Sequence, residues 1–345
     1  MEQAESKPWY IHTQKSDLLF IILCPLLAFL FVLAICEPRM KNGAFLYGSE
    51  TPYWFAIVST LLTHTHVLLV FIRSHLNQTV FKRYKYRFTL IPLIVLGSMW
   101  VSPLFFGALG ILAFYWDEYH SIMQTFGFGR IYDSKMGNDV AMGRKLDMFM
   151  CFVLGLLPHL ILFTYIPDVQ RSQGLIDYFD MTEKMIANFG WVLKSLRIPF
   201  YAFGILYTLF YIHRYRELHK FGYKMPMAKL ALFAVTGLTT ILTACFFTVA
   251  DGIFFGNIYH ALQYMFIVFV SERPNLADLT GLKKQEHKTG LNLIYFLVVI
   301  PFFLVIAALR QKTSTVPYLA AFWLLTSLLH FWFDGFIWSV RRQDV

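Results

Sequence analysis

The sequence predicts an all-α protein, a polytopic membrane bundle of about ten transmembrane helices with the N- and C-termini on the inner side. Composition is the first observation: of 345 residues, 57% are apolar and 15% are charged, and the mean hydropathy is +0.53. A water-soluble domain of this length could not bury so much apolar surface, so a lipid bilayer is the expected solvent. The second observation is the repeated occurrence of apolar runs long enough to span a bilayer.

Ten apolar runs are candidate spans, and residues 1–345 are expected to form a single integral membrane domain. The first run is long enough to cross the bilayer, which indicates a retained helix and not a cleaved signal. The third and fourth runs form one apolar stretch, which we divide at Ser102-Pro103 because proline readily ends or starts a helix. The spans are 18–36, 54–72, 87–101, 103–128, 146–166, 195–213, 230–248, 252–271, 290–309 and 316–340.

The positively charged residues predict the orientation of these spans. With the N-terminus inside, the inner segments hold 22 of the 30 Lys and Arg residues and the outer segments hold 8. Such an excess is typical of cytoplasmic loops and supports the division at Ser102-Pro103. It also accounts for the net charge of +9 without a nucleic-acid partner. Without the division, nine spans remain and the downstream topology inverts. We expect a multi-pass protein of the bacterial inner membrane or an equivalent membrane, surrounded by membrane lipids.

Histidines occur at similar depth in four spans, between the midplane and the inner surface. They are His66, His120, His260 and His330. Ionisable groups at this depth are costly and usually face the interior of the bundle. Neutral imidazole is a common ligand of iron, zinc and copper, and facing helices can hold a metal ion. We predict that these imidazoles bind a transition metal, with Asp334, one helical turn after His330, as a further ligand or an orienting group.

A second set of polar residues is expected to surround the metal ligands and to serve catalysis: Asp117, Glu118, His64, Gln124, Gln263 and Tyr264. Asp117 or Glu118 could complete the metal shell, hold a second ion, or form a structural ion pair with Arg73 or Arg130. His64 and His66 project about 200° apart on an ideal helix, so both reach one centre only if the helix is distorted.

Histidines near the inner face of a multi-span chain resemble those of the integral-membrane non-haem iron enzymes, namely desaturases, hydroxylases and alkane monooxygenases. The chain is also similar in hydrophobicity to the bacterial membrane carotenoid-cleaving oxygenases. The resemblance covers architecture only. The HxxxH and HxxHH boxes of desaturases are absent, and the chain offers HTH at 64–66 and the separate His120, His260 and His330. The resemblance implies iron and dioxygen chemistry, but no residue role is carried over by motif.

The leading hypothesis is an integral-membrane metal-dependent oxidoreductase, with iron as the expected metal and zinc as the alternative. Its substrate would be apolar or lipid-like, and an electron-donor protein is a further candidate partner. Zinc-assisted hydrolysis or acyl transfer uses similar ligands. A proton-coupled transporter would use the same His and Asp residues as a relay or a substrate site. A structural or assembly subunit is the third alternative, and it predicts that single His→Ala changes are tolerated.

Overall fold

The computed structural model describes residues 9–35, 39–41, 44–46, 53–165, 182–281 and 288–338. Most of these residues are helical, and the rest form turns, short connections and one short antiparallel strand pair, which confirms the predicted helical class. The elements in chain order are α1 (Gln14–Asp17), η1 (Leu18–Ile22), α2 (Cys24–Ile35), β1 (Arg39–Lys41), β2 (Ala44–Leu46), α3 (Tyr53–Phe71), η2 (Ile72–Leu76), α4 (Gln78–Val101), α5 (Pro103–Lys135), α6 (Arg144–Leu154), α7 (Leu156–Phe163), α9 (Glu183–Lys220), α10 (Met227–Phe246), α11 (Val249–Thr280), α12 (Lys288–Ile294), η4 (Tyr295–Val299), α13 (Ile300–Thr313) and α14 (Pro317–Ile337); η1, η2 and η4 are single π-helical segments.

Proline and capping residues account for several helix ends. Ser102 is extended (φ −125°, ψ 104°), the conformation that a following proline favours, and it separates α4 from α5 at the predicted division. Asn77 begins α4 by accepting a hydrogen bond from the backbone N–H of Val80. The predicted span 146–166 contains an unpredicted break at Gly155, between α6 and α7.

Seven helical segments in the described part of the chain are long and apolar enough to cross a membrane, or eight if the bent pair Gln14–Ile22 and Cys24–Ile35 counts as one span. This is consistent with a multi-pass membrane protein. Helices α4 and α5, which contain the predicted third and fourth spans, are outside this set. The count of ten spans and the positions of the termini therefore remain predictions.

The helices group into two compact units, each discontinuous in sequence. Unit 1 comprises residues 1–56 and 121–260, and unit 2 comprises residues 57–120 and 261–345. Helices α3, α5 and α11 contribute residues to both. The expectation of one membrane domain is not tested by this grouping and stays a prediction.

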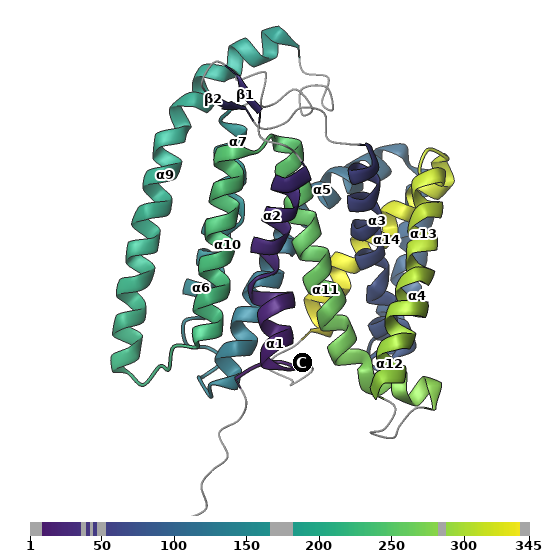
Figure 1. Ribbon diagram of the computed structural model, residues 1–345. Coiled ribbons are helices and arrows are strands. Elements are labelled where there is room, and N and C mark those ends of the chain that lie inside the picture. The colour runs from purple at the N-terminus through teal and green to yellow at the C-terminus, as the bar shows by residue number, and fades with distance from the viewer. Residues whose placement is uncertain are drawn as a thin grey trace, which may run out of the picture. The chain divides into compact units, whose positions relative to one another are not determined.

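In unit 1, α10 packs against α2, α6 and α7, and α9 contacts α6 and α7 (Figure 1). The contact between α10 and α6 is close because it uses small residues. A Cβ atom placed on Gly237 would lie 2.5 Å from Cδ2 of Leu154, and the Thr240 hydroxyl donates to the Leu154 carbonyl at 2.7 Å. Small residues and interhelical hydrogen bonds hold membrane helices together where the hydrophobic effect does not.

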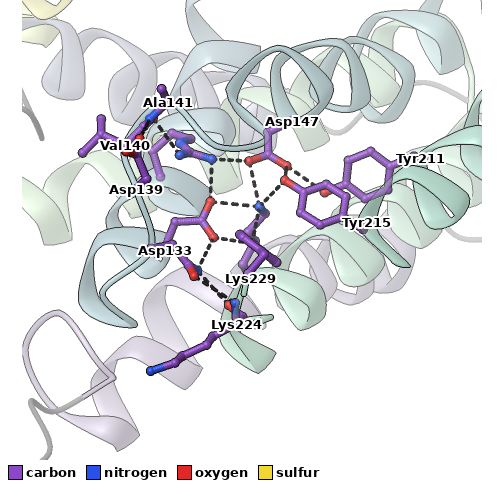
Figure 2. Close-up of polar contacts among 12 residues, drawn as sticks. Asp133, Asp139, Val140, Ala141, Asp147, Tyr211, Tyr215, Lys224 and Lys229 are labelled. Atoms are coloured by element: carbon purple, nitrogen blue, oxygen red, sulfur yellow. Dashed lines mark hydrogen bonds and ion pairs between the residues drawn. The ribbon is translucent and has the colours of Figure 1, made fainter. Parts of the chain in front are cut away.

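Unit 1 also contains a buried charge network, formed by two carboxylates and two cations. Lys229 on α10 lies between Asp133 and Asp147, with Nζ at 2.9 and 2.7 Å from their oxygens (Figure 2). Arg130 contacts the same two carboxylates at 2.6 Å. Tyr211 and Tyr215 on α9 donate to Asp147, and Tyr223 donates to Asp133. Arg130 and Lys229 belong to the 22 cations of the predicted inner segments, but the fold buries both and pairs them with carboxylates.

In unit 2, α14 packs against α4 through aromatic rings, including Phe88 against Phe333 at 4.7 Å between centroids. An ion pair lies at the end of α3: Arg73 Nη1 is 2.6 Å from Oε1 of Glu272 on α11. The Arg73 guanidinium also donates to the carbonyl of Ile337, where α14 ends. It thereby satisfies a carbonyl that has no partner within its own helix.

Candidate metal centre

Three helices of unit 2 bring imidazole rings together at one point. His66 on α3, His120 on α5 and His330 on α14 are all buried. The ring of His330 is central, with centroids 4.9 Å from His66 and 4.6 Å from His120, and both contacts are edge-to-face. Because His120 and His330 lie on helices far apart in sequence, only the tertiary fold creates this arrangement.

His260 on α11 completes the group. It is the residue at which α11 passes from unit 1 into unit 2, and the helix continues without a break to Tyr264 and beyond. One ring nitrogen from each of the four histidines lies within 4.8 Å of the others, a group that could hold a metal ion. Ligand nitrogens about 2.1 Å from one ion are at most about 4.2 Å apart. The most distant pair of nitrogens would therefore have to approach by roughly half an ångström if they lay on opposite sides of the ion, and by more if they were neighbouring ligands.

Asp334 lies one turn after His330 and faces two of the imidazoles. Its Oδ2 is 3.6 Å from Nε2 of His120 and 3.8 Å from Nε2 of His330. Neighbouring ligand atoms of one transition-metal ion are about 3.0–3.4 Å apart. This oxygen is thus placed either to reach a metal held by those nitrogens or to accept a hydrogen bond from one imidazole.

The other carboxylate oxygen of Asp334 is held by two donors. Tyr264 Oη and Trp338 Nε1 both donate to Oδ1, each at 2.9 Å. The Tyr264 ring also packs edge-to-face on His330, with 4.7 Å between centroids. The Arg73 guanidinium stacks over the Trp338 ring at 4.1 Å. These contacts orient the carboxylate, as hydrogen bonds to metal-site carboxylates generally do.

The predicted surrounding residues occupy different positions. His64 is outside the four-histidine group, as its angular offset from His66 predicts, and lies against the backbone of Ala307 on α13 and near Arg310. Asp117 interacts electrostatically with Arg310 and is also outside the group.

The remaining predicted residues also lie outside the group. Gln124 donates to the backbone carbonyl of His260 at 3.1 Å, so it supports the helix that carries a candidate ligand. Gln263 is buried and Glu118 half-buried. Arg73 pairs with Glu272, and Arg130 pairs with Asp133 and Asp147.

The sequence did not indicate that Trp338 donates a hydrogen bond to Asp334, or that Arg73 stacks on the Trp338 ring. Trp338 follows Asp334 by four residues, so helical spacing could have identified it. Arg73 was indicated only as an inner positive charge or as a candidate ion-pair partner of Asp117 or Glu118. Its contact with Trp338 depends on packing between segments far apart in the chain, which no local pattern shows.

Comparison with known proteins gave no match: no family model, no curated protein sequence and no solved structure is similar to this chain.

Proposed function

We propose that the protein is an integral-membrane, metal-dependent oxidoreductase that binds non-haem iron and acts on an apolar or lipid-like substrate. The observation that carries the proposal is the convergence of His66, His120, His260 and His330, whose ring nitrogens lie within 4.8 Å of one another. Placing a histidine within the membrane costs free energy, and histidines there tend to mark functional sites. Four of them meeting at a point are explained by a shared ion better than by four unrelated packing roles.

The number of histidines favours iron over zinc. Zinc is usually tetrahedral, so four protein ligands would fill its shell and leave no position for a substrate. An iron ion held by the four imidazoles would accept further ligands, of which Asp334 would be one. A zinc hydrolase would use a site with fewer protein ligands and a bound water. Iron bound here would supply dioxygen activation and electron transfer.

The chain's own residues would hold and shield this ion. The four histidines bind it, and Asp334 either joins them or orients an imidazole through its Oδ2. Tyr264 and Trp338 fix the Asp334 carboxylate by hydrogen bonds to Oδ1. The four histidines are buried, which suits an apolar substrate. An oxidoreductase of this kind needs electrons from elsewhere, so an electron-donor protein is part of the proposal.

We also propose the finer topology of ten spans with both termini on the inner side, with α4 and α5 as the third and fourth spans. Its support is the excess of positive residues on the inner segments. Single cysteines placed at exposed Lys85 and Lys312, in a chain whose four native cysteines are replaced by alanine, test it. A membrane-impermeant thiol reagent should label the second from outside intact cells and the first only after permeabilisation. The reverse pattern, or labelling of both from one side, contradicts the topology.

Metal analysis of the purified chain tests the function. We expect about one iron per chain after expression in iron-supplemented medium, since the structure offers one four-histidine group. The ferrous protein should also give the electron paramagnetic resonance signal of a nitric oxide complex, because that complex requires an open position. Protein that stays metal-free and catalytically active, or that holds only zinc with no open position, contradicts the proposal.

A further inference from the structure

Arg310 on α13 is anchored by two hydroxyl groups of α14. Its Nη2 donates to Ser327 Oγ at 2.9 Å and its Nη1 lies 3.4 Å from Thr326 Oγ1. Both α13 and α14 belong to unit 2 and are joined by residues 314–316. The guanidinium thus has a defined position against α14, the helix that carries His330.

The side chain of Arg310 points towards the centre of the candidate span. In two antiparallel helices joined by this short turn, Arg310 is level with about residue 320 of α14, and Ser327 lies about 10 Å deeper. Arginines near the end of a membrane helix normally extend towards the headgroups. This arginine takes the opposite direction at a cost in solvation, which indicates a role for a cation at that depth.

Two buried arginines, Arg73 and Arg130, have carboxylate partners that Arg310 lacks within the described part of the chain. Arg73 has a carboxylate at 2.6 Å, that of Glu272, and Arg130 has two at the same distance. Among the residues that the structure describes, no carboxylate lies within ion-pair distance of Arg310. Asp117 interacts with it only at longer range. Asp117 therefore offsets part of the positive charge of Arg310, but no carboxylate of the described residues contacts the N–H groups of the guanidinium.

This arginine lies about one helical turn from the four-histidine group. Thr326 and Ser327 precede His330 by four and three residues, and Asp117 precedes His120 by three. These offsets place both pairs on shared helix faces, about 5 Å apart along the axis. Arg310 and Ser327 are half-buried, whereas His330 has no exposed surface. The arginine thus lies nearer the surface of unit 2 than His330 does.

We infer that Arg310, positioned by Ser327, binds the carboxylate of a long-chain apolar acid, and that such acids are the substrate class of the proposed enzyme. Binding of the carboxylate by Arg310 does not depend on the proposed function. Only the statement that such acids are the substrate class rests on it. A planar guanidinium matches a carboxylate with two parallel hydrogen bonds, and an apolar chain suits a protein embedded in lipid. Because the histidine group is one turn away, the reaction takes place within the first few carbons of the acid.

Binding of radiolabelled palmitate to the purified, metal-free full-length chain tests this inference. We expect palmitate to bind and unlabelled hexadecanol or acetate to displace it poorly, since one lacks the charge and the other the chain. Arg310→Met should weaken palmitate binding by about tenfold to a hundredfold. Ser327→Ala, which removes only the anchor, should weaken it by about two- to tenfold. Lys312→Met removes an exposed cation from the same helix end and should leave palmitate binding unchanged.

Several results would overturn the inference. These are unaltered palmitate binding in a monodisperse Arg310→Met protein, equal binding of hexadecanol, and displacement by acetate at equal concentration. If Arg310→Met does not fold, Ser327→Ala and the ligand comparison on the unchanged chain decide. His330→Ala, tested in parallel, should keep palmitate binding. A chain that binds palmitate but no metal contradicts the proposed function alone, and one that binds iron but not palmitate contradicts this inference alone.

Discussion

Replacing Asp147 with asparagine measures how much the buried charge network contributes to the stability of unit 1. Asp147 is fully buried and accepts hydrogen bonds from Arg130, Lys229, Tyr211 and Tyr215, at 2.5 to 2.8 Å. Asparagine keeps the shape of the side chain but removes one of the two negative charges. It also places an NH2 group against groups that are themselves donors.

The expected loss of stability follows from the charge balance. Two carboxylates and two cations are present, so Asp147→Asn leaves one buried cation uncompensated. Breaking a buried ion pair by removing one partner costs about 3 to 5 kcal/mol. Asp139→Asn is the matched control, because Asp139 is exposed and asparagine can still accept the hydrogen bond from the backbone N–H of Ala141. Its effect should stay within about 0.5 kcal/mol.

Equilibrium unfolding in mixed micelles, followed by circular dichroism, provides the measurement. The double variant Asp147→Asn with Lys229→Met restores neutrality, with Arg130 facing Asp133. Its free energy of unfolding should therefore exceed the value expected from adding the two single effects by about 2 kcal/mol. A loss below about 1 kcal/mol for Asp147→Asn, or strict additivity in the double variant, would show that the network is not a cooperative unit.

Three further predictions concern the metal centre and the backbone. His330→Ala should abolish stoichiometric iron binding while His64→Ala retains it, as measured by elemental analysis; equal retention in both would exclude His330 as a ligand. Asp334→Asn should keep the metal but weaken its affinity about ten- to a hundredfold in chelator competition, and an unchanged affinity would exclude a role for that carboxylate. Gly143→Ala should lower the free energy of unfolding by about 2 kcal/mol or more, because φ is +70° and the added Cβ would clash with the hydroxyl oxygen of Tyr215. Gly137→Ala, at φ +76° with open space, should cost only about 1 kcal/mol, and equal losses would contradict the steric part of the argument.

The distribution of Lys and Arg along the chain predicts the orientation of the spans but not the burial of individual cations. A count of Lys and Arg by segment predicts orientation because the bias is a sum over many residues. The same count cannot tell which cations are solvated. Arg130 and Lys229 contribute to it equally with exposed Lys85, yet the fold buries both beside Asp133 and Asp147.

The sequence by itself determined the helical class, the apolar segments, the break at Ser102-Pro103 and the separation of His64 from His66. Each of these follows from local composition or from the angular period of one helix. Only the tertiary structure decided that His66, His120 and His330 converge, that Trp338 and Tyr264 orient Asp334, and that Arg310 points inward. Those facts depend on the rotation and depth at which separate helices pack. These quantities are set by contacts between residues far apart in the chain, so no pattern within a single segment encodes them.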